Sequence, residues 1–212
     1  MKKFMVLLMF LIFLFISNLY SQCPTLWTIE GPFIVTWAKY PGCSIFFSYQ
    51  WRLDEGCNLE ISDLVYSSHY PCDVVNIDPD AYTYFYQLAA NDAMYNHVMG
   101  SIPPCGSERG MTLKIFHKKC QTIKNEQYPG GNWVITTYTC SEATGNCWQL
   151  YEICIDNTKV PPKVKIIYNS EGADGEVNCN GVYPPVIPPQ GKTFYESWTL
   201  PCFATPCSNR IF

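Results

Sequence analysis

Twelve cysteines constrain the fold of this 212-residue chain more than any other feature of its sequence. An even number of cysteines in an exported chain predicts a framework of disulfide bonds. The residues that we expect to form six such bonds are Cys23, Cys43, Cys57, Cys72, Cys105, Cys120, Cys140, Cys147, Cys154, Cys179, Cys202 and Cys207. Because disulfides persist in oxidising compartments, this count predicts a secreted protein that is extracellular, periplasmic or on the outer surface of a bacterium.

The N-terminal segment has the parts of a secretory signal peptide. Lys2 and Lys3 give it a positive charge, residues 4–16 form an unbroken apolar run, and Ser21 supplies a small residue for cleavage. A membrane-spanning helix needs about 20 apolar residues, so this run is short for an anchor. We predict a cleaved signal peptide over residues 1–21, which leaves a mature chain that is not an integral membrane protein. An uncleaved N-terminal anchor is the alternative interpretation.

The charge of the mature chain excludes one class of partner. Without Lys2 and Lys3, 12 of the 14 basic residues remain against 18 acidic ones, and the longest basic cluster is Lys118-Lys119. A chain with this balance lacks the basic patch that binding to nucleic acid requires, so we expect no nucleic acid partner. Aromatic residues make up 16% of the sequence, which is typical of a folded chain, since disordered chains are poor in aromatics.

The spacing of the cysteines and acidic residues argues against a bound metal. Structural zinc sites need two close pairs of ligands, and only Cys202 and Cys207 are close enough to form one pair. Residues 176–181 place oxygen-bearing side chains at alternate positions before a glycine, as in a calcium loop. Ile187, however, stands where that loop needs its closing carboxylate. We therefore predict no metal site and no cofactor.

Hydrophobic alternation predicts a β-hairpin within the N-terminal region, residues 22–70. Apolar and polar residues alternate over residues 45–52, which is the pattern of a half-buried strand. Residues 53–56 have turn chemistry, and residues 59–66 return as a second strand. A shorter β-branched run at residues 33–37 precedes the hairpin and predicts a further strand.

Residues 79–99 carry the strongest helix signal of the chain. Asp78 can cap the first turn, Pro79 loses no hydrogen bond at the first helical position, and Gly100 stands where a left-handed C-terminal residue is wanted. The apolar residues that recur at helical spacing are Tyr82, Phe85, Leu88, Ala89, Met94 and Val98. The aromatic cluster at residues 82–86 could be interpreted as a cofactor site, but we favour a stripe that faces the core.

A second β region, residues 110–170, is predicted to form an antiparallel meander. Apolar residues alternate at 111–115, and further strands are expected at 133–140, 147–155 and 164–168.

One disulfide can be predicted from the register of this meander. If the turn between its second and third long strands is tight, Cys140 faces Cys147, and Tyr138 pairs with Gln149. Residues that face each other in antiparallel strands are close enough for a disulfide. We therefore predict a Cys140–Cys147 bond.

These elements predict one disulfide-rich domain over residues 22–212. Its fold class is α+β: a mainly antiparallel β-sheet, made of a hairpin and a meander, with one central helix, disulfide-stapled throughout. Residues 171–212 form a proline- and cysteine-rich tail, which would be a linker without the cysteines that hold it.

No catalytic site can be assigned from the sequence. The three histidines, His69, His97 and His117, stand apart, and none has a carboxylate or a second histidine at metal-binding spacing. His117 falls on the apolar side of its strand, where we expect a satisfied, partly buried imidazole. An even number of cysteines leaves no thiol for a nucleophile. The sequence has no motif of serine hydrolases, zinc proteases or nucleotide-binding loops.

Acidic residues give a weak case for catalysis. A glycosidase needs two carboxylates that face each other across a cleft. The candidates are Asp54, Glu55, Asp63, Asp73, Asp78 and Asp80. Most of them fall in turns or at the cap of the helix, which explains their positions without catalysis. A hydrolase whose site assembles from separated residues stays an alternative.

Two segments resemble a group of bacterial proteins, the small, cysteine-rich exported proteins of the Bacteroidota and Chlorobi type. The residues that carry the likeness are Met1-Lys2-Lys3 leading to Leu19-Tyr20-Ser21-Gln22, and the hairpin motif Tyr49-x-Trp51-Arg52, Gly56 and Glu60-Ile61. That group has no assigned activity, so the resemblance implies export and no particular chemistry. The sequence has no Asn-x-Ser/Thr site for N-glycosylation, which fits a bacterial exporter.

We predict a secreted or cell-surface protein without enzymatic activity that has a binding or structural role. The sequence contains 15 tyrosines and 6 tryptophans, and these side chains give contact area at a low cost in conformational entropy. The expected partner is an extracellular protein or a glycan. The alternatives are a secreted hydrolase with a non-local active site, and a protease-inhibitor or toxin-like effector that presents the loop Ser141–Asn146.

Overall fold

The computed structural model contains a ten-stranded sheet and one long helix. It describes residues 23, 25–140, 145–177, 179–181, 184–205, 207 and 210–212, so the predicted signal peptide and most of the loop Ser141–Asn146 lie outside the described residues. The strands are β1 (Thr28–Thr36), β2 (Ser44–Leu53), β3 (Leu59–His69), β4 (Met111–Lys118), β5 (Cys120–Gln127), β6 (Trp133–Thr139), β7 (Asn146–Asp156), β8 (Lys163–Asp174), β9 (Trp198–Thr199) and β10 (Phe203–Ala204).

The sheet divides at β3, which has different neighbours along its two halves. One side of β3 pairs with β2 over most of its length. On the other side, residues 59–61 pair with β4 in parallel and residues 66–69 pair with β6 antiparallel. The order is therefore β1-β2-β3-β4-β7-β8 on one path and β3-β6-β5 on the other, with β9 and β10 both beside β5.

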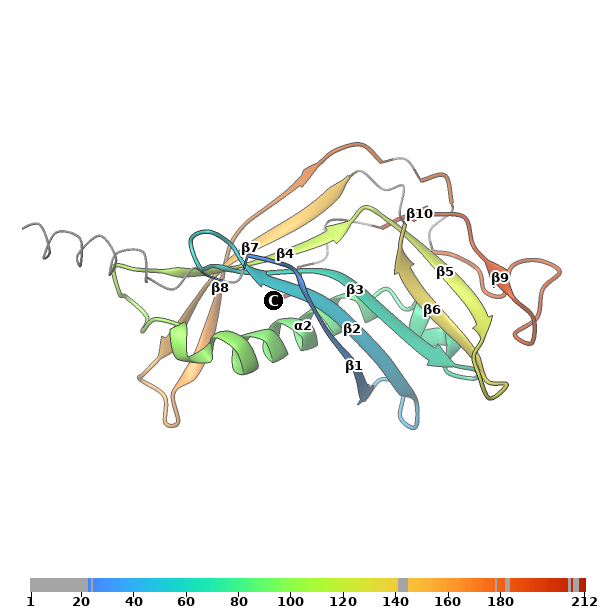
Figure 1. Ribbon diagram of the computed structural model, residues 1–212, viewed down its shortest axis with the longest axis horizontal. Helices are drawn as coiled ribbons and strands as arrows, with labels where there is room; N and C mark the ends of the chain where they lie inside the picture. Colours follow the sequence, from blue (N-terminus) through green and yellow to red (C-terminus); the bar gives the residue numbers. More distant parts are fainter. Residues whose placement is uncertain are drawn as a thin grey trace, which may run out of the picture.

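We call these two parts the helix-covered region and the tail-covered region. The helix-covered region comprises β1, β2, β3, β4, β7 and β8 with the helix, and the tail-covered region comprises β5, β6, β9 and β10 with the tail segments up to residue 205. Figure 1 shows β5, β6 and β9 together at one end of the molecule. The predicted α+β class, with a mainly antiparallel sheet and one long helix, is confirmed.

The helix α2 (Ala81–Ala93) begins two residues later than predicted and continues as a π-helical turn (η2, Met94–Val98) and a 3-10 turn (η3, Met99–Ser101). Asp78 supports its start, since the carboxylate accepts the backbone N–H of Asp80 at 2.8 Å. Gly100 lies inside the last turn, so the prediction of a left-handed residue beyond the helix is wrong.

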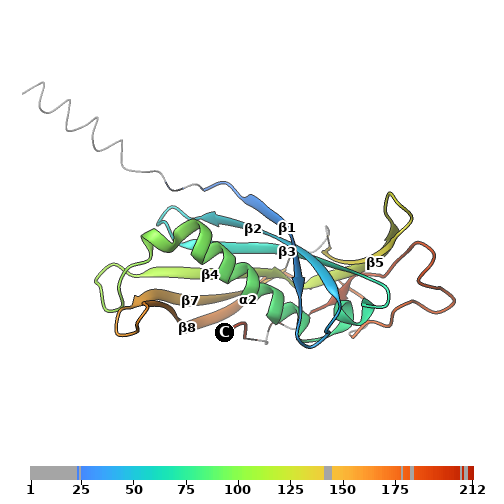
Figure 2. The same ribbon diagram turned by 90° about the horizontal axis from the view of Figure 1, so that it is seen from below.

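The aromatic stripe of the helix is part of the hydrophobic core. The buried residues along this face are Ala81, Phe85, Tyr86, Ala89, Ala90, Ala93, Met94 and Val98. They pack on alternate residues of the strands, such as Leu59 and Ile61 of β3 and Leu113 and Ile115 of β4. Figure 2 shows α2 lying across one face of this part of the sheet.

The predicted β2–β3 hairpin is confirmed, and its turn explains one acidic residue. The Asp54 carboxylate accepts the backbone N–H groups of Gly56 and Asn58, each at 2.8 Å. An aspartate that bonds to its own turn in this way stabilises the reversal of the chain. Strand β1 precedes the hairpin and pairs with β2. A short 3-10 helix, η1 (Asp73–Ile77), connects the hairpin to α2.

The predicted Cys140–Cys147 bond is wrong, because β6 and β7 are not neighbours. Strand β6 pairs with β3 and β5, whereas β7 pairs with β4 and β8. Tyr138 accordingly faces Thr122 instead of Gln149. Strand β6 therefore belongs to the tail-covered region and β7 to the helix-covered region, and the predicted simple meander does not form.

All twelve cysteines are paired, as the sequence predicts, and half of the bonds fix the tail. The six bonds are Cys23–Cys57, Cys43–Cys72, Cys105–Cys154, Cys120–Cys179, Cys140–Cys202 and Cys147–Cys207. The last three join the tail to the start of β5, the end of β6 and the start of β7. Six disulfides imply an oxidising compartment, extracellular or periplasmic. Within the described residues, no helix is both long and apolar enough to cross a membrane.

The last two residues return to the helix-covered region. Ile211 is fully buried, and its N–H donates to Gln149 Oε1 at 3.1 Å and to the Tyr151 hydroxyl at 3.2 Å. Gln87 of α2 donates to the Ile211 carbonyl, and the Phe212 ring packs edge-on against Tyr151. The tail therefore contributes to both parts of the molecule.

Candidate functional site

An open cleft of about 410 Å³ lies where the end of β3 meets two segments of the tail-covered region. The end of β3, the turn between β5 and β6, and the tail each form one wall. The residues that line it are His69, Tyr70, Gly131, Asn132, Trp133 and Tyr195. We call this feature the aromatic cleft.

The wall from β3 is fixed to the wall from β6. His69 ends β3, and its Nδ1 lies 3.2 Å from the backbone oxygen of Trp133, the first residue of β6. Because a carbonyl only accepts, this contact requires Nδ1 to carry the proton. Tyr70 follows, with 46% of its surface exposed. The Tyr70 ring stacks on Phe194 of the tail at 4.8 Å, which joins the third wall to the first.

The tail wall has no regular secondary structure, and side-chain hydrogen bonds hold it instead. The amide of Asn125, a fully buried residue of β5, donates to the backbone oxygens of Phe194 and Glu196 at 3.1 and 2.8 Å. These two bonds fix the backbone on both sides of Tyr195, a residue that is 69% exposed.

A second set of contacts closes the same loop. The Glu196 carboxylate accepts from Lys192 at 3.1 Å and from the Thr193 N–H at 2.8 Å, and these bonds lower the pKa of Glu196. Trp198 is buried and donates from its indole nitrogen to the Thr193 carbonyl at 2.9 Å. The chain around Tyr195 is therefore preformed.

The turn between β5 and β6 forms the remaining wall and depends on glycine. Gly130 and Gly131 have φ values of 105° and 86°, which side chains strongly disfavour. The turn is closed by the Tyr128 N–H, which donates to the Asn132 carbonyl at 2.9 Å, and by the Gly131 N–H, which donates to the Tyr128 carbonyl at 3.0 Å. This geometry brings the exposed Asn132 to the rim of the cleft.

The lining of the aromatic cleft combines apolar ring faces with neutral hydrogen-bonding groups. Three of the six lining residues are Tyr or Trp, and the others offer an imidazole, an amide and a glycine backbone; none is a carboxylate, lysine or arginine. Such a lining suits an uncharged ligand that has both apolar faces and hydroxyl groups.

Comparison with known proteins adds no relative. No family model matches the chain, and neither the curated proteins nor the solved structures give a match.

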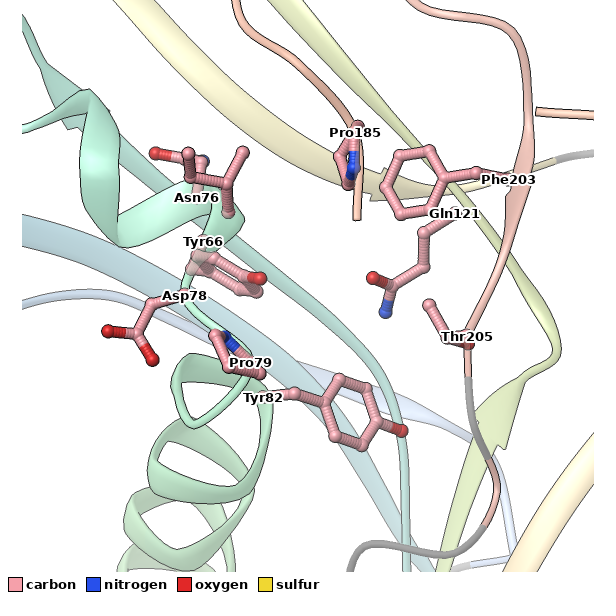
Figure 3. Close-up of a pocket in the computed structure, with 10 residues that line it drawn as sticks. Tyr66, Asn76, Asp78, Pro79, Tyr82, Gln121, Pro185, Phe203 and Thr205 are labelled. Atoms are coloured by element: carbon pink, nitrogen blue, oxygen red, sulfur yellow. The ribbon is translucent and has the colours of Figure 1, made fainter. Parts of the chain in front are cut away.

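A smaller cavity, of about 30 Å³, lies between η1, the start of α2 and the tail-covered region. Figure 3 shows Asp78 and Tyr82 on one side of it and Gln121 and Thr205 on the other, with the Tyr82 hydroxyl directed away from Asp78. A space of this size has room for about one or two water molecules. It is too small for an organic ligand.

Two of the polar side chains at this cavity, Asn76 and Asp78, have structural partners, whereas the Tyr82 hydroxyl has no hydrogen-bond partner among the described residues. Asn76 donates to Thr137 Oγ1 at 3.0 Å and accepts from Ser68 Oγ at 2.6 Å, which ties η1 to β3 and β6. Burial acts to raise the pKa of Asp78, but hydrogen bonds from Lys39 and Tyr40 outweigh it and leave that pKa below its usual value.

The structure does not bring the three histidines together. His69 lies in the aromatic cleft, while His97 stacks on Trp51 at 4.1 Å and lies 3.4 Å from Glu30. His117 lies on the helix side of β4 and is 3% exposed, against the edge of Tyr82. Burial lowers the pKa of His117 to about 4. The prediction that its imidazole is satisfied is wrong for one atom, because Nδ1 has no hydrogen-bond partner among the described residues.

The six acidic candidates are also dispersed. Asp54 and Glu55 form the hairpin turn, Asp63 lies within β3 and Asp73 begins η1. Asp78 and Asp80 share Lys39 at the start of α2. Among the described residues, no group of three or more His, Cys, Asp or Glu side chains could hold a metal ion.

Sequence reasoning missed most of the aromatic cleft. Of its lining residues, only His69 was singled out as a candidate for chemistry. One sequence feature could have indicated the cleft, namely aromatic residues next to turn residues, as in Tyr70-Pro71 and Gly130-Gly131-Asn132-Trp133. Such loop positions carry function more often than core positions do.

Proposed function

We propose that this protein is an exported, non-enzymatic protein that binds a neutral carbohydrate in the aromatic cleft. The observation that carries the proposal is the arrangement of Tyr70, Trp133 and Tyr195 around a cleft with neutral polar groups at its rim. The resemblance to exported bacterial proteins supports a bacterial cell surface or its surroundings as the place where this binding occurs.

The chemistry of a sugar ring fits this lining. A pyranose has a face of C–H groups, which carry a small positive charge, and aromatic rings carry negative charge on their faces. Hydroxyl groups at the edge of the sugar both donate and accept, as do the Asn132 amide and the backbone of the β5–β6 turn. An uncharged lining favours neutral sugars over sialic or uronic acids.

The rigidity of the cleft supports affinity. Binding costs free energy when side chains and loops become ordered in the complex. Here the loop that carries Tyr195 is already held by Asn125 and Glu196, and the turn that carries Asn132 is closed by its own hydrogen bonds. A glycan is favoured over a protein as the ligand of this cleft. The six lining residues offer a contact area that suits one or two sugar rings, whereas a stable protein–protein interface needs a much larger surface.

The test is a glycan array of neutral and acidic oligosaccharides, probed with the oxidised mature protein and followed by calorimetry on the best ligand. We expect binding to neutral glycans, and we expect Tyr195→Ala and Tyr70→Ala each to weaken it by about tenfold or more, as loss of an aromatic anchor does. The matched control is Tyr95→Ala in η2, at a tyrosine of similar exposure (54%) that does not line the cleft, and this variant should bind like the wild type.

Three outcomes would contradict the proposal. The first is binding to no neutral glycan, and the second is equal binding by the Tyr195→Ala variant. The third is release of new reducing ends from a bound glycan, which would make the protein a hydrolase.

A further inference from the structure

A second groove of about 410 Å³ lies in the helix-covered region, between the outer strand β1 and helix α2. The residues that line it are Phe33, Ile34, Val35, Phe47, Leu88, Asn91, Asp92, Tyr95 and Asn96. We call it the β1–α2 groove. Its lining differs from that of the aromatic cleft, because it is mostly apolar and contains one acidic residue.

Strand β1 has a free edge beside this groove. Among the described residues it pairs with β2 alone, as β8 at the other limit of this region pairs with β7 alone. Natural proteins protect such edges with charged residues, above all lysine. Strand β8 follows this rule with the exposed Lys163 and Lys165. Strand β1 has no lysine and instead exposes Ile29 and Ile34, at 70% and 66%.

The backbone of β1 directs polar groups toward the helix. The Thr36 carbonyl accepts a hydrogen bond from the Tyr84 hydroxyl of α2 at 3.4 Å. Because backbone groups two residues apart in a strand point to the same side, the N–H and C=O of Ile34 also point toward α2. The irregularity between Glu30 and Phe33 contains Pro32, which has no N–H, so the usable edge lies within residues 33–36 and consists of the N–H and C=O of Ile34 and the N–H of Thr36.

The floor and the wall of the groove are shaped for apolar side chains. The rings of Phe33 and Phe47 pack at 5.2 Å on the sheet side. Leu88 and the 54%-exposed Tyr95 form the helix side. An exposed apolar surface of this kind next to a free strand edge is typical of sites where an extended peptide adds to a sheet.

The groove carries a negative charge, which indicates that an extended peptide bound there should carry a positive one. The Asp92 carboxylate accepts from the Tyr49 hydroxyl at 2.5 Å and from the Asn96 amide at 2.6 Å. Burial and the nearby Asp92 raise the pKa of Tyr49, so its hydroxyl stays a donor. Among the described residues, no lysine, arginine or histidine forms an ion pair with Asp92. The negative charge of the groove is therefore left for a partner to balance.

We propose that the β1–α2 groove binds an extended segment of a partner protein, which adds to β1 at residues 33–36, packs apolar side chains on Phe33 and Tyr95, and pairs a lysine or arginine with Asp92. A second copy of this chain fits less well. Its own β1 would bring Glu30 and no basic residue toward Asp92. The occupant is accordingly a different protein, and the site is independent of the aromatic cleft.

The experiment is a selection from a random seven-residue peptide library against the oxidised mature protein, with the Asp92→Asn variant as the counter-target. This substitution keeps one oxygen for the Tyr49 hydroxyl, removes the charge, and replaces the oxygen that accepts from the exposed Asn96 amide with an NH2 group. We expect enriched peptides with one Lys or Arg between apolar residues, and affinity about tenfold weaker for Asp92→Asn. Methylation of the peptide nitrogens that face Ile34 should weaken binding by a similar factor, because it removes donors to the strand edge.

Controls separate this site from the other one. Tyr95→Ala should weaken peptide binding and leave glycan binding intact, whereas Tyr195→Ala should do the reverse. Circular dichroism and thermal unfolding of each variant establish that it is folded. The proposal fails if no peptide is enriched, if enriched peptides lack a basic residue or bind Asp92→Asn equally well, if N-methylated peptides bind as tightly as the parent, or if the groove is blocked by self-association of the chain.

Discussion

The helix-covered and tail-covered regions share β3 but are held together in different ways. In the described residues, the core of the helix-covered region contains 24 buried apolar side chains, whereas the core under the tail contains four: Ile123, Ile135, Trp198 and Phe203. A large, regular face of a helix can therefore stabilise the first region through burial. The second region has too little apolar surface to be stabilised in that way alone.

Covalent bonds replace burial in the tail-covered region. Cys120 and Cys140 are buried there and form a cluster with Cys179 and Cys202. The tail itself has only two strands of two residues each, so backbone pairing adds little. A disulfide stabilises a fold mainly because it restricts the unfolded chain, and the stabilisation is largest when the bond closes a long loop. This fold therefore stabilises one region by packing and the other by cross-links, and the cross-linked region carries most of the aromatic cleft.

The largest effect should come from a cavity in the helix-covered core. Phe85 is fully buried, and its ring lies 4.8 Å from Tyr66 and 5.8 Å from Phe47. We expect Phe85→Ala to lower the free energy of unfolding by about 3–5 kcal/mol, measured by urea unfolding with the disulfides intact. Val160→Ala, at a side chain that is 97% exposed, should change it by less than about 0.5 kcal/mol. A loss below about 1 kcal/mol for Phe85→Ala would show that burial by α2 does not dominate this region.

Removal of one tail bond should have a smaller and more local effect. Replacement of both Cys140 and Cys202 by Ala opens a connection across 62 residues, and we expect a loss of about 2–4 kcal/mol. Hydrogen exchange followed by mass spectrometry should show faster exchange in β5, β9 and the segment around Tyr195, with α2 unchanged. The same variant should bind glycan more weakly, because the tail that carries Tyr195 loses one of its covalent attachments and its hydrogen bonds alone hold it less firmly.

The matched control for that variant is removal of Cys23–Cys57, which ties the N-terminal segment to the β2–β3 turn. It should leave exchange in the tail-covered region unchanged. If the tail double variant instead loosened α2 as much as β9, the two regions would form one cooperative unit and the comparison would be wrong.

Local sequence patterns predicted the elements whose structure depends on near neighbours. The helical stripe around Phe85 and Ala89 and the turn at Asp54 are encoded over spans of a few residues, and both were found. The prediction of a Cys140–Cys147 bond was wrong because it depended on which strands are neighbours in the sheet, which is not a local property. The division of the sheet at β3 places β3 and β4 between β6 and β7, and no local pattern reports such a division.

The aromatic cleft could not be predicted for a related reason. Its walls come from residues 69–70, 131–133 and 195, which only the tertiary fold brings together. The tail wall is fixed by Asn125, a residue of β5 that is about 70 positions away from the backbone that it holds. A sequence shows that an aromatic residue is present, but its exposure at a cleft depends on such distant contacts.

Acid should weaken the helix-covered region selectively. Burial against Tyr82 and Tyr86 keeps His117 neutral in the native protein and lowers its pKa to about 4. The unfolded chain has the ordinary value of about 6.5, so below pH 6.5 it takes up a proton that the native state does not accept until about pH 4. Acid therefore favours unfolding over this range, by about 2 kcal/mol at pH 5 and about 3 kcal/mol at pH 4.

His117→Gln should flatten this part of the pH dependence, measured as the difference from the wild type in urea unfolding between pH 7 and pH 4. Tyr82→Phe keeps the ring that buries the imidazole and removes a hydroxyl that lacks a hydrogen-bond partner within 3.5 Å in the described structure, so it should keep the slope. Hydrogen exchange at pH 5 should then show α2 and β4 losing protection before the disulfide-bonded β5 and β6 do. Removal of the Cys140–Cys202 bond should weaken the tail-covered region first, whereas acid should weaken the helix-covered region first, because disulfide bonds do not titrate. If β5 and β6 lost protection before α2 and β4 in acid, His117 would not be the group that links the stability of this core to pH.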